Sequence, residues 1–132
     1  MTAEPAVNEA SVSVRKGPLV GPVLGRVVGM LAARAQCPID RLDDAMLLTD
    51  AVAAHAPAHT TEDHVRVVVA ADEGGIELRV GALARDGATG LLADAELPGV
   101  GNVFKRVADE VDARPADDGA AVLVLRLRFA PA

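Results

Sequence analysis

Residues 65–83 read VRVVVAADEGGIELRVGAL, in which two runs rich in Val, Ile and Leu flank the tetrapeptide DEGG. Apolar, β-branched runs on either side of a short glycine-containing turn are typical of a β-hairpin. The stretch therefore predicts two antiparallel strands, at residues 65–71 and 76–83, and it places a sheet at the centre of the fold.

Two further segments predict strands on either side of this hairpin. The alternating letters SVSVR favour a short strand at residues 10–15. The segment AAVLVLRLRF at residues 120–129 places large apolar side chains on one face and Arg126 and Arg128 on the other. A turn at residues 117–119, Asp-Asp-Gly, is expected to precede this last strand.

Helical periodicity appears in three other segments. Residues 19–36 carry an apolar stripe, and Pro38 ends it. Asp40 is a suitable N-cap for a second helix, which Pro57 closes. Residues 98–112 predict a third helix, and the small, polar residues 84–96 predict a mobile, lid-like loop.

These elements predict an α+β fold, a two-layer sandwich in which helices pack on one face of a mainly antiparallel sheet. Its length of 132 residues suits one domain, expected at residues 10–132 after a flexible N-terminus at residues 1–9. The first helix carries Gly21, Gly25 and Gly29 at steps of four, a smooth ridge that permits close approach of another backbone. Packing within the fold is the favoured interpretation, and a homodimer contact is the alternative.

Composition excludes several classes of function. The net charge is −6, the 13 basic residues are scattered, and Phe104 and Phe129 are the only aromatic residues, so direct binding of nucleic acid is not expected. A basic or neutral partner suits this charge better. The lone Cys37 indicates a reducing compartment and an inert thiol. Residues 1–10 lack signal-peptide character, and Arg26 interrupts the longest apolar run, so we expect a cytoplasmic protein without a membrane span.

Three histidines lie within ten residues of one another. His55 and His59 have the helical spacing of a zinc pair, but Pro57 interrupts the helix that would align them, and His64 lies in the following loop. Exposed loop histidines are the favoured interpretation, and no metal site is predicted.

The order of elements and three local segments together resemble the GHKL ATPase domain, in the form of the small bacterial anti-sigma-factor serine kinases. DRLDDAMLLTDAVAAHA at residues 40–56 resembles the nucleotide-binding helix of that family, and LRVGAL at residues 78–83 stands where the family has its adenine-reading strand. LPGVGNVFKRVADEVD at residues 97–112 resembles the glycine-rich turn and helix that wrap the phosphates, and this match is the closest. With the order of elements, the resemblance covers most of the chain after the first ten residues.

The resemblance implies specific site residues, and the chain departs from several of them. Asp50 aligns with the catalytic glutamate, whereas Ala54 replaces the magnesium-binding asparagine, and a methyl group offers Mg²⁺ no oxygen ligand. Ala82 stands in place of the aspartate that reads adenine. The glycines Gly99 and Gly101, with Asn102, keep a phosphate-loop character, although glycines before a helix also simply form a tight turn.

Two hypotheses of different classes follow from this resemblance. The preferred one is a degenerate anti-sigma-factor-like domain, a pseudokinase that regulates transcription by binding a sigma factor or an anti-anti-sigma protein, with no cofactor. Its partner surface is expected on the first two helices or on residues 84–97. The alternative is an ATP-dependent serine kinase with Asp50 as base and Mg²⁺ held by other acids, for which Asp43, Asp44 and Asp86 are poor candidates. A third interpretation is a likeness of fold alone, which does not specify function.

Overall fold

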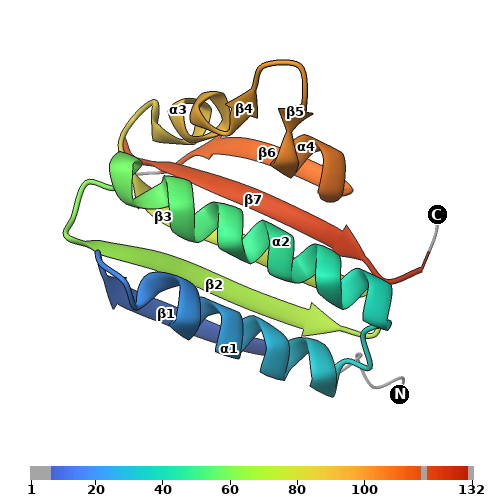
Figure 1. Ribbon diagram of the computed structural model, residues 1–132. Helices are drawn as coiled ribbons and strands as arrows, with labels where there is room; N and C mark the ends of the chain where they lie inside the picture. The colour runs from blue at the N-terminus through green and yellow to red at the C-terminus, as the bar shows by residue number, and fades with distance from the viewer. Residues whose placement is uncertain (1–6, 117–118, 131–132) are drawn as a thin grey trace.

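The computed structural model describes residues 7–116 and 119–130, and its centre is a five-stranded sheet in the order β1-β2-β3-β7-β6 (Figure 1). Every neighbouring pair in this sheet is antiparallel. The strands are, in chain order, β1 (Asn8–Arg15), β2 (His64–Asp72), β3 (Gly75–Leu83), β6 (Glu110–Pro115) and β7 (Ala121–Arg128). The predicted hairpin is confirmed as β2 and β3, with register Asp72 opposite Gly75.

Helices cover one face of this sheet. Figure 1 shows two long helices side by side over β1, β2 and β3, and the shorter elements beside them near β6 and β7. The elements outside the main sheet are α1 (Val20–Arg34), α2 (Ile39–His55), the 3₁₀ turn η1 (Ala56–His59), α3 (Gly87–Asp94), the strands β4 (Glu96–Leu97) and β5 (Gly101–Asn102), and α4 (Val103–Val107). The α+β two-layer architecture is therefore confirmed.

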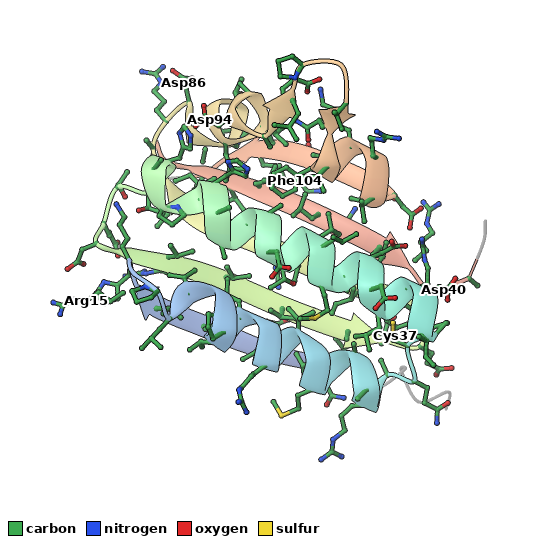
Figure 2. The ribbon with its side chains drawn as sticks, in the orientation of Figure 1. Arg15, Cys37, Asp40, Asp86, Asp94 and Phe104 are labelled. Carbon is green, nitrogen blue, oxygen red and sulfur yellow. The ribbon has the colours of Figure 1, made fainter. Side chains whose placement is uncertain are left out.

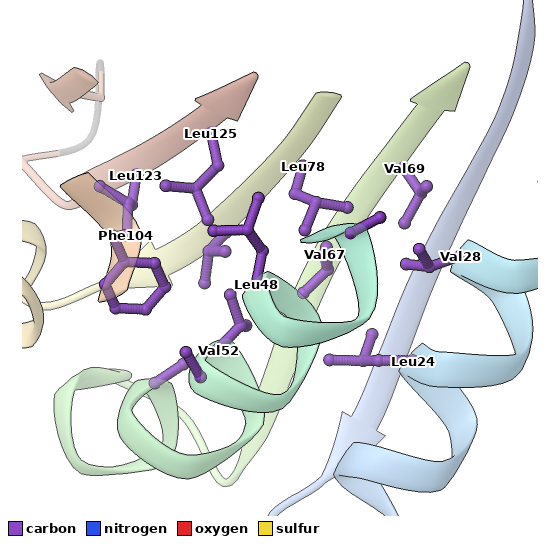
Figure 3. Packing of buried hydrophobic residues seen from close by; sticks show 14 of the residues in the cluster. Leu24, Val28, Leu48, Val52, Val67, Val69, Leu78, Phe104, Leu123 and Leu125 are labelled. Carbon is purple, nitrogen blue, oxygen red and sulfur yellow. The ribbon is translucent and has the colours of Figure 1, made fainter. Parts of the chain in front are cut away.

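The core lies between the sheet and the two long helices. Alternate residues of β2 and β3 face the helices because strand side chains point to opposite faces in turn. Figure 3 shows the resulting contacts of helix and strand side chains; the labelled members are Leu24, Val28, Leu48, Val52, Val67, Val69, Leu78, Phe104, Leu123 and Leu125. Each fully buried side chain of this kind stabilises the fold by roughly 1.5–3 kcal/mol.

Small residues bring α1 and α2 close together. A Cβ atom on Gly21 would lie 3.6 Å from Ala53 Cβ, and one on Gly25 would lie 3.2 Å from Met46 Cε. Gly29 has nothing within 4 Å of its Cβ position. Two of the three ridge glycines thus pack within the fold, and the third faces open space.

The expected mobile loop at residues 84–96 is wrong, because most of it forms α3. Ala88 and Leu91 are buried three residues apart, and this apolar pair docks the helix onto the rest of the molecule. The glycines in this segment allow α3 to approach η1 closely, because a Cβ atom on Gly90 would lie only 2.8 Å from the His59 ring. Tertiary packing therefore overrides the loop-like composition.

The expected long helix at residues 98–112 is also wrong. Only Val103–Val107 is helical, and Glu110–Pro115 forms the edge strand β6 on β7. The apolar spacing fits a helix, but the free edge of β7 offers backbone partners that a solvent-exposed helix would not use.

Smaller boundary differences occur elsewhere. Asn8 and Glu9 belong to β1, so the expected flexible N-terminus is wrong at these positions, and residues 1–6 lie outside the described residues. The N-cap of α2 is Pro38, and Asp40 sits in the first turn, where its charge still suits the helix dipole. The turn expected at residues 117–119 falls largely outside the described residues, although Gly119 has φ +85°.

Candidate functional site

The helix that resembles the nucleotide-binding helix presents its two key positions to solvent. Asp50 and Ala54 belong to an exposed stripe along α2, which we call the α2 stripe: Asp40, Asp43, Leu47, Asp50 and Ala54. Residues three and four apart share a helix face, so these five side chains form one continuous surface. Asp50 makes no hydrogen bond or ion pair with any residue that the structure describes. It is a free surface carboxylate.

The segment that resembles the phosphate loop is the tip of a tight hairpin between β4 and β5. Gly99 and Gly101 have φ of +77° and +101°, and Val100 N–H donates to Leu97 O at 3.0 Å. Only glycine adopts such angles without steric cost, so the turn itself explains both glycines. Arg106 Nη1 donates to Val100 O at 2.6 Å and holds the tip against α4.

Asn102 is buried, and both of its side-chain groups have partners. Its Oδ1 accepts a hydrogen bond from Phe104 N–H at 3.0 Å, so Asn102 caps α4. Its Nδ2 donates to Leu92 O at 2.6 Å and joins the cap to α3. These two bonds tie the end of the glycine turn to α3 and α4, which gives Asn102 a structural role.

Phe104 fills the space between α2 and β7. Its side chain is fully buried; Figure 2 labels it beside α2, and Figure 3 shows its ring near Leu123 and Val52. The His55 ring contacts it edge to face, with centroids 6.4 Å apart and an interplanar angle of 68°. Phe104 therefore fills the space between α2 and α4.

Ala82 lies in a different part of the molecule from these residues. It sits in a bulge of β3 between Val80 and Leu83 with φ +55°, and its carbonyl oxygen accepts from Thr61 N–H at 3.0 Å and Thr61 Oγ1 at 3.2 Å. Ala82 lines a hollow on the sheet face that the helices leave open. The fold thus places Asn102 at the start of α4, which packs on α2, and places Ala82 at a separate hollow on the open face of the sheet.

The hollow beside Ala82 was not expected from the sequence. It encloses about 700 Å³ above the outward-facing residues of β1, β2 and β3. Its walls include Arg66, which pairs with Glu62 at 2.8 Å, and Arg79, which pairs with Glu9 at 3.3 Å. Small outward residues at alternate strand positions are the signal that predicts such a hollow; they are Ser11, Ser13 and Gly81.

A charged network covers the other end of the open face. Glu110 accepts from Arg126 Nη1 at 2.8 Å and from Arg128 Nη2 at 2.9 Å, and Arg126 Nε also reaches Glu77 at 3.2 Å. The hydrogen bond from Arg126 is the main reason that the pKa of Glu110 is lowered, and the same bond raises the pKa of Arg126. The network joins the three neighbouring strands β3, β7 and β6.

The three histidines point to separate partners. His59 Nε2 lies 2.5 Å from Asp94 Oδ2, and His64 Nδ1 lies 2.7 Å from Asp63 Oδ1, which lowers the pKa of Asp63. Within residues 7–116 and 119–130, no group of three or more His, Cys, Asp or Glu residues is arranged to hold a metal ion. His59 was expected in an exposed loop, but it is largely buried between η1 and α3.

Cys37 lies in the connection between α1 and α2. Its thiol is half-buried and donates to Pro38 O at 3.4 Å, and burial is the main cause of its raised pKa. The thiolate is the nucleophilic form, so these surroundings favour the unreactive thiol.

The sequence matches no protein-family model, and a search of curated proteins finds no match. The likeness to GHKL domains therefore rests on the quoted segments and on the order of elements. No helix in the described part of the chain is long and apolar enough to cross a membrane.

Proposed function

We propose that this chain is a degenerate GHKL-like regulatory domain that acts by binding another protein and has lost nucleotide binding and kinase activity. By resemblance, the partner is a sigma factor or an anti-anti-sigma protein. The observation that carries the proposal is Phe104 of α4, whose buried ring fills the space between α2 and α4.

A nucleotide bound between α2 and α4 would have to displace a buried side chain. A ligand entering between α2 and α4 first removes Phe104 from its contacts, at a loss of roughly 1.5–3 kcal/mol, before it makes any contact of its own. Ala54 then leaves Mg²⁺ without the side-chain oxygen that the resemblance requires.

The α2 stripe is the surface best suited to a partner. It combines the carboxylates of Asp40, Asp43 and Asp50 with Leu47, which is 49% exposed. Acidic groups around an apolar contact favour a basic partner surface, because complementary charge speeds association and excludes acidic competitors. The hairpin tip adds two exposed apolar side chains, Leu97 and Val100.

Calorimetric titration with ADP and ATP, with and without Mg²⁺, tests the loss of nucleotide binding. We expect no saturable heat up to millimolar nucleotide. Saturable, magnesium-dependent binding at micromolar concentration would overturn the proposal and support the serine kinase. The variant Ala54→Asn restores the missing amide at an exposed helix position, and we expect it to remain inert because Phe104 still fills the space. Binding by this variant would contradict the argument from Phe104.

Titration against sigma factors and anti-anti-sigma proteins of the same host tests the partner. We expect one of them to bind, with affinity reduced about tenfold by the double variant Asp43→Lys, Asp50→Lys. The double variant Glu73→Lys, Asp112→Lys is the matched control, because it changes the net charge by the same amount at two exposed acids outside α2. Equal losses in both variants would show a general effect of net charge and would remove α2 from the interface.

A further inference from the structure

The strand β1 forms a long open edge of the sheet. Among the described residues, only β2 pairs with it, so one row of backbone groups along Asn8–Arg15 has no strand partner. Proteins usually protect such edges with Lys, Pro or bulges. The interior of β1, Ala-Ser-Val-Ser-Val at residues 10–14, carries none of these. This edge is therefore able to pair with another strand.

The residues of β1 are complementary to β1 itself. We propose that β1 pairs antiparallel with β1 of a second copy of this chain, about a two-fold axis at Val12, to form one continuous sheet. In this register Glu9 lies opposite the partner's Arg15 at both ends of the interface, and Ser11 lies opposite the partner's Ser13. A shift of two residues in either direction removes both charge pairs. Opposite charges directly across a strand pair stabilise it, so the charges select this register.

The register also places both helical layers on the same side. Paired residues of antiparallel strands point to the same face, and a slip of one residue would put the layers on opposite faces. Val12 is half-buried against the helical side, and Ser11 and Ser13 line the open face. The helix α1 packs on both β1 and β2, as Figure 1 shows. With strands about 4.8 Å apart, a helix centred between them lies about 10 Å from its symmetry mate, the usual spacing of packed helices.

The flank of α1 above this edge carries exposed apolar side chains, with the exposed residues Arg26 and Arg34 at its margins. At 100° per residue, Leu19, Val23 and Met30 lie on the side opposite Gly21 and Gly25, which face α2. Leu19 is 64% exposed and Met30 is 58% exposed. The second α1 helix of the dimer would cover these side chains, so the strand edge and the helix flank form one surface with one occupant.

The mass in solution and its response to charge reversal test the proposal. Sedimentation and light scattering should give twice the chain mass of 13.5 kDa at protein concentrations of tens of micromolar. Glu9→Arg and Arg15→Glu each place like charges opposite one another twice, and each should raise the dimer dissociation constant about tenfold. The double variant restores both pairs and should return it to within a few-fold of the original.

The double variant distinguishes pairing between two copies from effects within one chain, because it restores the charge pairs only between copies. Glu9 also contacts Arg79, and Arg15 lies 4.0 Å from Asp63 in the same chain. The double variant leaves both intrachain contacts reversed, so a purely structural effect would make it worse than either single variant. A monomer at all concentrations, or a double variant that stays dissociated, would overturn the proposal.

A crosslink tests the position of the two-fold axis without charge changes. In a Cys37→Ser background, Val12→Cys should form an intermolecular disulfide on mild oxidation, because opposite Cα atoms of antiparallel strands lie within disulfide range. Val14→Cys is the control, since its two copies would be about 13 Å apart along the strands. Crosslinking at both positions, or at neither, would contradict this register.

Discussion

Arg41 on α2 donates through Nη2 to Asp109 Oδ2 at 2.9 Å, and the same carboxylate oxygen accepts from Arg128 N–H at 2.6 Å. Arg41 Nε donates to Arg128 O at 2.8 Å. Two side chains 68 residues apart thus join the start of α2, the end of β7 and the loop before β6. These hydrogen bonds hold the helical layer over the edge of the sheet formed by β7 and β6. The sequence predicts this edge less clearly than the rest of the sheet.

Loss of Arg41 should therefore destabilise the fold. Arg41→Ala removes three hydrogen bonds of a side chain that is 25% exposed, and we expect the free energy of unfolding to fall by about 1–2 kcal/mol. Urea unfolding followed by circular dichroism measures this change. Arg114→Ala is the matched control, because its one pair with Asp112 is half exposed and should contribute under about 1 kcal/mol. Equal effects of the two substitutions would show that the Arg41 hydrogen bonds contribute no more to the free energy of unfolding than an exposed ion pair does.

Two helical glycines should respond to alanine in opposite ways. Gly90→Ala places a methyl group 2.8 Å from the His59 ring, and we expect a loss of about 1–3 kcal/mol as α3 moves from η1. Gly29→Ala places one in open space within α1 and should stabilise the protein by about 0.5–1 kcal/mol through helix propensity. Urea unfolding of both variants at one fixed protein concentration keeps any dimer contribution constant. A stabilising Gly90→Ala would contradict the observed docking of α3.

The central elements of the fold are readable from the sequence because local pattern and tertiary packing agree there. The runs at residues 65–71 and 76–83 have the period of strands and are buried on one face, and the stripe of α1 has the period of a helix. The predicted and observed elements therefore differ only at their ends in this half of the chain.

The predictions for residues 84–112 are wrong because long-range contacts decide the structure of this segment. Glycines at 87 and 90 indicate a loop locally, yet they permit the contact with His59 that docks α3. The apolar spacing of residues 100–111 fits a helix, yet Glu110 and Val111 pair with β7. The site at Gly99, Gly101 and Asn102 stays a prediction: the turn alone accounts for both glycines, and Phe104 contacts His55 of α2, a long-range contact that the local pattern does not specify.

The bulge at Ala82 should favour glycine. A left-handed conformation costs a residue with a Cβ atom roughly 1–2 kcal/mol, and Ala82 has φ +55°. We expect Ala82→Gly to stabilise the protein by about 0.5–1 kcal/mol in urea unfolding, because glycine avoids most of that cost. Ala33→Gly on the exposed side of α1 is the control and should destabilise by about 1 kcal/mol. A loss of stability in Ala82→Gly would mean that the Ala82 methyl group stabilises the fold by more than its left-handed backbone conformation costs.

Acid should weaken the network around Glu110. The bonds from Arg126 and Arg128 lower the pKa of Glu110 below its ordinary value of 4.5, so the folded protein binds this proton less readily than the unfolded chain. The carboxylate therefore stabilises the fold fully above pH 4.5, and this contribution is lost as the pH falls through the folded-state pKa. Glu110→Gln removes the titrating group, so the fall in stability between pH 5 and pH 3 should be shallower in this variant. We would measure urea midpoints across that range, with Glu73→Gln, an exposed turn residue, as the control; parallel curves for all three proteins would contradict the assignment.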